Sequence, residues 1–301
     1  MKYYLLLLLG FTFMNVNAQN SIDIVKLSYS NTPLNKFENS QEKTNVAQYA
    51  MELNFPVVLN EKHTLLTGVF GNRTRLKFDD NISDYLNVNT IGLKLGLNSI
   101  YSDKWSGTYI LLPKLSSDLA NVSGEDFQIG IVGLANYKKR ENLKYKFGFY
   151  FNTETYGSSF VPLFGLYYLS PNNKLETNLT LPILADVNYM LSKIISVGMN
   201  FDGLGSSYNL NDVIYTPTGE YLSIKSNELF GYFRFKIGES FNVKTKIGYS
   251  FYRTTEIYSD DDLISLAIAS INFGDDRAPL NDNFKDGPIF KLELLYTLHF
   301  K

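Results

Sequence analysis

Apolar and polar residues alternate along nearly the whole chain, and this pattern constrains the fold more than any other feature. In NLKYKFGFYFNTE, residues 142–154, apolar side chains occupy the odd positions from Leu143 to Phe151, while Lys144 and Lys146 occupy even ones. Strict alternation over about ten residues predicts a β-strand whose two faces meet different environments. The question that decides function is which environment lies on which side.

The same alternation recurs in five further segments, at 46–57, 89–99, 175–183, 241–252 and 289–300. Two segments, 109–115 and 160–169, are apolar on both faces. No segment after the first twenty residues approaches the eighteen or so uninterrupted apolar residues of a membrane-spanning helix. The chain is therefore expected to be all-β.

Short and long connections alternate between these strands. Tight polar turns are expected at 60–63, 102–105, 139–143, 170–174, 192–193 and 238–240, and longer links at 32–44, 76–86, 116–125, 203–220 and 257–287. An up-and-down barrel has this pattern when one rim carries tight turns and the other carries long loops.

Counting with this rule gives about fourteen strands, an even number that places both termini on the short-turn side. They are expected near 21–31, 45–58, 63–75, 86–101, 105–115, 125–138, 143–154, 159–169, 174–182, 184–191, 194–206, 221–237, 241–256 and 288–300. Pro182 interrupts the ladder of one predicted pair, so twelve strands is the alternative. No break in composition suggests a second domain.

The first eighteen residues, MKYYLLLLLGFTFMNVNA, combine one lysine, an apolar run of about eleven residues and small residues before a cleavage site. We expect residues 1–18 to be a secretory signal peptide and residues 19–301 to form the barrel. The run is too short for an anchor helix, which needs roughly twenty residues. The chain has no cysteine, which excludes disulfides and thiolate metal sites, and its net charge of -2 gives no reason to expect a nucleic-acid partner.

A soluble β-sandwich also alternates, with its apolar face inward, and is the minor alternative. Three features favour a membrane barrel instead. The predicted strands run about ten to fifteen residues, against five or six in a typical soluble sheet. Aromatic residues such as Tyr101, Trp105 and Tyr137 cluster near strand ends, and the polar face repeatedly carries full charges. We therefore expect the apolar face, including Phe149, to contact lipid and the charged face to line a wet lumen.

The signal peptide, the segment LPILADVNYMLSKIISVG at 181–198 and the C-terminal LLYTLHFK together resemble outer-membrane β-barrel proteins of Gram-negative bacteria, in particular uncharacterised barrel families of the Bacteroidota. The resemblance implies an outer-membrane location, outer-membrane lipid as surroundings, and insertion by the barrel-assembly machinery. That machinery reads a last strand of alternating apolar residues ending in an aromatic, which Tyr296, Leu298 and Phe300 match. Lys301 after the aromatic is a departure from the pattern.

Six basic residues share the polar face beside two tight turns: Lys144, Lys146, Arg234, Lys236, Lys244 and Lys246. They could form a basic patch at the periplasmic end of the lumen that attracts anionic solutes. Alternatively, acidic residues on neighbouring strands neutralise them.

The longest loop contains SDDDLISLAIASINFGDD at 259–276. Its capping-like spacing and apolar residues at helical intervals predict a short helix, with Asp262, Leu263, Leu266 and Ile268 as candidates for a plug or constriction. An extracellular flap is the alternative. The loop aspartates could bind Ca²⁺, although solvation of an acidic loop is the favoured interpretation.

No catalytic, metal or cofactor motif is present, and His63 and His299, the two histidines, are expected to be ordinary rim residues. The sequence therefore predicts a barrel without catalysis that passes or binds small solutes, since about fourteen strands enclose more space than side chains fill. A structural barrel acting through its extracellular loops is the alternative function.

Overall fold

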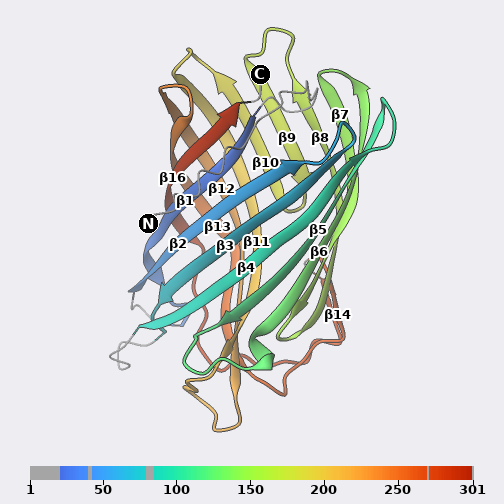
Figure 1. The fold of residues 1–301 in the computed structure, drawn as a ribbon. Helices are drawn as coiled ribbons and strands as arrows, with labels where there is room; N and C mark the ends of the chain where they lie inside the picture. Colours follow the sequence, from blue (N-terminus) through green and yellow to red (C-terminus); the bar gives the residue numbers. More distant parts are fainter. Residues whose placement is uncertain (1–20, 40–42, 79–84, 270, 300–301) are drawn as a thin grey trace, which may run out of the picture.

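The computed structural model describes residues 21–39, 43–78, 85–269 and 271–299 (Figure 1). The predicted signal peptide and Phe300 lie outside these residues. Within them, no helix has the length and apolar character needed to cross a membrane.

Fourteen long strands form one sheet. They are β1 (Ser21–Lys36), β2 (Lys43–Val58), β3 (His63–Leu76), β4 (Leu86–Ile100), β5 (Trp105–Ser117), β6 (Phe127–Arg140), β7 (Leu143–Glu154), β8 (Gly157–Leu169), β9 (Leu175–Leu181), β10 (Leu184–Met190), β11 (Ile195–Leu210), β12 (Glu220–Ile237), β13 (Phe241–Ser259) and β16 (Gly287–His299). A single 3₁₀ turn, η1 (Gly124–Asp126), precedes β6, and two short strands, β14 (Leu266–Ile268) and β15 (Ile271–Phe273), lie between β13 and β16.

Each long strand pairs antiparallel with the next, and β16 pairs with both β13 and β1, which closes the sheet into a barrel. Figure 1 shows the tight turns at one rim and the long connections at the other. The predicted fourteen-stranded up-and-down barrel is confirmed, and the twelve-strand alternative is wrong because the segment around Pro182 still forms the β9–β10 hairpin. The soluble sandwich is also wrong, since one closed sheet replaces two packed ones.

The outer wall of the barrel is apolar. On β7, Phe147 and Phe149 point outward and are 47% and 39% exposed, whereas Asn152 on the other face is 1% exposed. Phe164 on β8 is 59% exposed. The predicted orientation of the two faces is therefore confirmed, and this inversion of the usual rule is typical of a barrel whose wall contacts lipid.

Aromatic side chains gather at the rim that carries the tight turns. Trp105 at the start of β5 packs on Tyr137 of β6 with ring centroids 4.9 Å apart. Next to them, the Tyr101 hydroxyl donates a hydrogen bond to the Tyr109 hydroxyl at 3.0 Å. Such residues prefer the boundary between hydrocarbon and water, so this rim has the composition of a membrane interface.

The β9–β10 hairpin is much shorter than its neighbours, and this leaves a gap in the barrel wall on the long-loop side. β9 pairs with β8 only from Phe164 to Leu169, and β10 pairs with β11 only from Ser196 to Asp202. Residues 157–163 of β8 and 203–210 of β11 therefore extend beyond the hairpin. The connection between β13 and β16 fills part of this gap, because β14 pairs in parallel with β8 at Ser159 and Phe160.

Candidate functional site

Charged side chains line the interior on the side formed by β1, β11, β13 and β16. Lys246 Nζ lies 3.0 Å from Glu293 Oε1, and Lys26 Nζ lies 3.5 Å from the same oxygen. Lys291 Nζ lies 3.2 Å from Asp202 Oδ2. The Lys246 and Glu293 side chains are only 3% and 2% exposed, so their charges are held in a nearly dry part of the wall.

Other inward charges remain accessible to water. Lys94 forms an ion pair with Glu52, whose side chain is 35% exposed although it points inward. Lys26, which pairs with Glu52 in the β1–β2 register, is 39% exposed in its side chain. Water therefore reaches the interior at the height of these residues, as expected for a barrel of this strand number.

The six residues of the predicted basic patch fall on two separate parts of the wall. Lys144 and Lys146 lie on β7, whereas Arg234 and Lys236 lie on β12 and Lys244 and Lys246 on β13, and β8–β11 stand between the two groups. Lys246 is paired with Glu293, and Lys244 Nζ lies 3.5 Å from Asp186 Oδ2.

Lys146 has a different environment from the lysines of β13. Its ammonium group donates hydrogen bonds to Asn178 and Thr180 of β9, the latter at 3.3 Å, and among the described residues it has no carboxylate partner within 4 Å. Lys144 Nζ lies 5.8 Å from the ring centroid of Tyr167. The two lysines of β13, Lys244 and Lys246, thus each have an acidic partner, whereas Lys146 of β7 has none among the described residues. A preference of the lumen for anions stays a prediction.

The end of β11 crosses the interior toward the opposite wall. Asn209 of β11 pairs in parallel with Ser117 of β5, although five strands separate β5 and β11 in the sheet order. The Ser116 hydroxyl donates to the Ser207 carbonyl at 2.8 Å, and the Asn209 amide donates to Asp126 Oδ1 at 2.8 Å. Two facing walls of the barrel are therefore joined near the long loops.

A buried carboxylate completes this junction. Glu154 at the end of β7 accepts hydrogen bonds from the Ser207 backbone N–H at 2.8 Å and from the Ser207 hydroxyl at 2.6 Å. Lys114 Nζ lies 3.8 Å from the other oxygen of Glu154, and the Glu154 side chain is 4% exposed. We call these contacts the β11 latch: they join Ser207 and Asn209 of β11 to Glu154, Ser116 and Asp126 on the facing side of the barrel.

An apolar cluster fills the space on the other face of the latch. Its nine buried members come from the ends of five strands and from the connections between them: Phe37, Leu76, Phe78, Val88, Tyr208, Leu210, Leu222, Ile257 and Phe284. Leu76, Val88, Leu222 and Ile257 are completely buried. Packed apolar side chains therefore occupy the long-loop end of the barrel beside the latch, whereas the interior further down carries charged side chains.

The predicted helix within 259–276 is wrong, because this segment forms the β14–β15 hairpin. Asp262 precedes the hairpin, Leu263 is 53% exposed, and Leu266 and Ile268 belong to β14. The backbone N–H of Ile264 donates to the Tyr156 carbonyl at 2.9 Å and that of Ala269 to the Phe160 carbonyl at 2.8 Å. Backbone groups of β8, left without a β9 partner, thus favour a strand over a helix, and whether the hairpin restricts passage stays a prediction.

Arg277 anchors the connection behind this hairpin. Its guanidinium carbon lies 4.3 Å from the ring centroid of Tyr258 and 5.4 Å from that of Tyr156, and it donates a hydrogen bond of 3.1 Å to the Tyr221 hydroxyl. It also forms a two-point ion pair with Asp275 at 2.8 and 3.0 Å. Hydrogen bonds from Arg277 hold the pKa of Asp275 below its usual range.

Sequence reasoning missed the latch. The alternation in 142–154 places Glu154 on the same face as Lys144 and Lys146, but nothing in the pattern indicates that it contacts Ser207, 53 residues away in the chain. The signal that does exist is the polarity of GSSYNLND, which resembles an ordinary loop. His63 lies at the rim, where its Nδ1 is 3.0 Å from the Ser99 hydroxyl, and the described residues contain no group of three side chains suited to a metal ion.

The fold and its interior define a class: a closed fourteen-stranded antiparallel barrel with an apolar outer wall, a charged interior and a strand end that bridges two facing walls. The chain belongs to the family described as Domain of unknown function (DUF6268), whose model matches residues 14–265. No curated protein matches the sequence.

Solved outer-membrane proteins resemble the chain in fold. The COG4313 outer membrane channel from Pseudomonas putida F1 is 7% identical, with 92% of this chain and 95% of that chain covered and a TM-score of 0.47. A Pseudomonas aeruginosa FadL homologue is 10% identical, with 94% and 91% covered and a TM-score of 0.46. The TodX monoaromatic hydrocarbon channel deltaS2 mutant is 10% identical, with 92% and 90% covered and a TM-score of 0.40. At these levels the comparisons carry no argument about what this chain transports.

Proposed function

We propose that the protein is an outer-membrane channel for small solutes, exported by its signal peptide, with no catalytic step of its own. The observation that carries the proposal is the contrast between the two faces of the wall. Outward side chains such as Phe149 are apolar and exposed, whereas inward side chains such as Lys26 and Glu52 are charged and reached by water. A wall of this kind separates lipid from an aqueous path.

We infer that the bridged long-loop end, where β11 reaches β5 beside the apolar cluster, acts as a gate of the channel. The β11 latch is held by hydrogen bonds to two buried carboxylates, Glu154 and Asp126, and not by a covalent link. Two displacements would open a path: withdrawal of β11 from β5, or departure of the β14–β15 hairpin from β8. The first would open the barrel along its axis, and the second would open its wall.

Single-channel recording in planar bilayers tests the gate. Because the chain has no cysteine, a double variant S117C/N209C carries the sole thiol pair, at two positions that are partners in the strand register. We expect the parent to show openings, the oxidised variant to show none, and reduction to restore them. The pair A267C/S159C applies the same lock to the β14–β8 contact.

The two locks separate the two routes. Loss of current with the first lock alone supports axial opening, and loss with the second alone supports opening through the wall. The single variant S117C serves as the control for substitution without a cross-link. A folded parent that carries no current, together with a silent E154A variant lacking the latch carboxylate, would exclude the channel.

A structural or surface-binding barrel is the second candidate, and the apolar cluster favours it. Nine buried side chains packed across the long-loop end resemble a permanent core more than a mobile gate. If the E154A variant stays silent while the barrel folds normally, this second function is the better one.

A further inference from the structure

Two arginines point outward from the barrel wall, where the alternation of this chain places apolar residues. Arg73 and Arg75 of β3 follow Gly71 on the same outward face, and both are exposed. In the register, Arg73 lies between Tyr49 of β2 and Asn89 of β4. On the outward face of β3, Arg73 and Arg75 therefore lie two and four residues beyond Gly71, toward the long loops.

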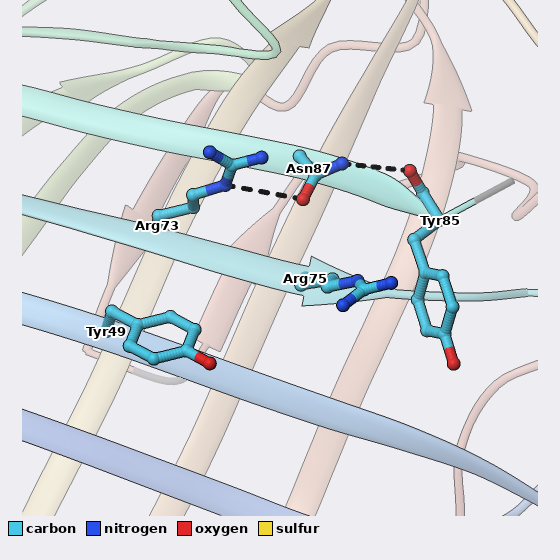
Figure 2. Close-up of a pocket in the computed structure, with 5 residues that line it drawn as sticks. All are labelled: Tyr49, Arg73, Arg75, Tyr85 and Asn87. Carbon is cyan, nitrogen blue, oxygen red and sulfur yellow. Dashed lines mark hydrogen bonds between the residues drawn. The ribbon is translucent and has the colours of Figure 1, made fainter.

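The two guanidinium groups border one hollow on this face. Its volume is about 660 Å³, and Tyr49, Arg73, Arg75, Tyr85 and Asn87 line it. Figure 2 shows Tyr49 on one side of the arginines and Tyr85 on the other. Arg73 Nε donates to Asn87 Oδ1 at 3.3 Å, and the guanidinium carbon of Arg75 lies 3.9 Å from the ring centroid of Tyr85. Among the described residues, the two neighbours that position these cations, Asn87 and Tyr85, are uncharged.

Across residues 21–39, 43–78, 85–269 and 271–299, no carboxylate lies within ion-pairing distance of Arg73 or Arg75. By contrast, Lys246 and Lys291 point inward, and each has a carboxylate within ion-pairing distance. Two like charges two residues apart on one strand face repel each other and favour an anion between them. Because guanidinium groups bind phosphate through two parallel hydrogen bonds, a phosphate group matches this pair.

An apolar hollow adjoins the arginines on the side away from the loops. It has a volume of about 430 Å³, shares Tyr49 with the first hollow, and is bordered by Leu27, Met51, Gly71 and Ile91. These four residues form one row across β1–β4 in the register. Gly71 has no side chain, so a shallow channel runs between Met51 and Ile91 directly below Arg73.

We propose that this face binds a membrane lipid of the leaflet next to the long loops, with its phosphate-bearing headgroup on Arg73 and Arg75 and an acyl chain over Gly71. The inference rests on the proposal that the barrel spans a membrane. The order of the two hollows matches an amphipathic molecule, because the cationic hollow lies nearer the loops and the apolar one nearer the middle of the wall. The tyrosines fit the same boundary, where aromatic residues with a polar tip are preferred.

Lipid binding to the detergent-refolded full chain tests the proposal by native mass spectrometry. The probes are a short-chain phosphatidic acid, which carries an exposed phosphate, and phosphatidylcholine of the same chain length. We expect the parent to prefer phosphatidic acid, and the variant R73Q/R75Q to bind it at least about tenfold more weakly. The control R140Q removes an exposed arginine at the tight-turn rim and should leave the affinity unchanged.

Three results would overturn the lipid site. Equal binding by the parent and R73Q/R75Q overturns the site, as does an equal loss in R140Q. If inorganic phosphate at the same concentration displaces the lipid completely, the site is one for free phosphate and the lipid assignment is wrong. The single variants R73Q and R75Q, each with an expected loss of about threefold, replace the double variant if it does not refold. A parent that fails to fold in detergent or vesicles refutes the membrane proposal as well, whereas a folded parent without lipid preference refutes only this inference.

Discussion

Replacing Phe149 by arginine tests which face of the wall meets lipid. Phe149 lies near the middle of β7, is 39% exposed, and has its ring centroid 5.9 Å from that of Phe160 on β8. An arginine on the lipid face at the middle of a bilayer costs about 2 to 4 kcal/mol. At about 1.4 kcal/mol per tenfold, the ratio of folded to unfolded protein should fall by roughly 30-fold to 700-fold.

The comparison variant F149L separates the charge from the lost ring contact, since an aromatic pair contributes about 0.5 to 1.5 kcal/mol. Y145R places the same charge four residues nearer the tight-turn rim, where the expected cost is about 0 to 1 kcal/mol. Equilibrium unfolding by guanidinium chloride in phospholipid vesicles, followed by the fluorescence of Trp105, the single tryptophan, gives the free energies. If F149R matched F149L, or Y145R lost as much as F149R, the assignment of the outward face to lipid would be refuted.

Three further predictions follow from the interior and the connection after β13. E293Q should lower the free energy of unfolding by about 3 to 5 kcal/mol in the same assay, because it leaves the buried Lys246 without its carboxylate, whereas K138M, which breaks the exposed pair with Glu141, should lower it by about 0 to 1 kcal/mol. G157A should speed proteolysis within 257–287, because Gly157 has a φ of +133° and an added Cβ would lie 2.6 Å from the Ile264 carbonyl oxygen; G124A, where the added Cβ meets nothing within 4 Å, should not. Protection of the same segment against proteolysis should be constant from pH 7 to about 4 and should decline below that. Hydrogen bonds from Arg277 lower the pKa of Asp275 in the folded protein. A carboxylate with a lowered pKa stabilises the fold above its ordinary pKa and loses that effect as it becomes protonated. D275N should abolish this pH dependence, and a decline that survives in D275N would contradict it.

The alternation of residues predicted most of the barrel because a strand repeats every two residues and each face of the wall meets one solvent. The predicted segment 143–154 coincides with β7, and 241–256 lies within β13. The alternation stops indicating the inward face where a strand contains a bulge. At Tyr252, a residue with a φ of +50° that is 80% exposed, the β12–β13 register shifts and the inward face changes from even to odd positions, so that Arg253 becomes buried.

The helix predicted in 259–276 failed for another reason. Its apolar spacing is compatible with a helix, but β8 offers backbone groups that the short β9 does not reach, and a strand satisfies them. A local pattern contains no information about an unpaired edge formed more than a hundred residues earlier. The same holds for Arg73 and Arg75, whose shared hollow depends on Tyr49 of a different strand and Tyr85 beyond the next loop.

The sequence by itself determined the fourteen long strands, their antiparallel order and the face that most side chains take, because these follow from period-two alternation and the lengths of the connections. The tertiary structure alone decided that the wall is shortened at β9–β10, that β11 crosses to β5, and that Glu154 meets Ser207. The physical reason is that these contacts join residues far apart in the chain, and they form only once a closed barrel brings its opposite walls within hydrogen-bonding distance.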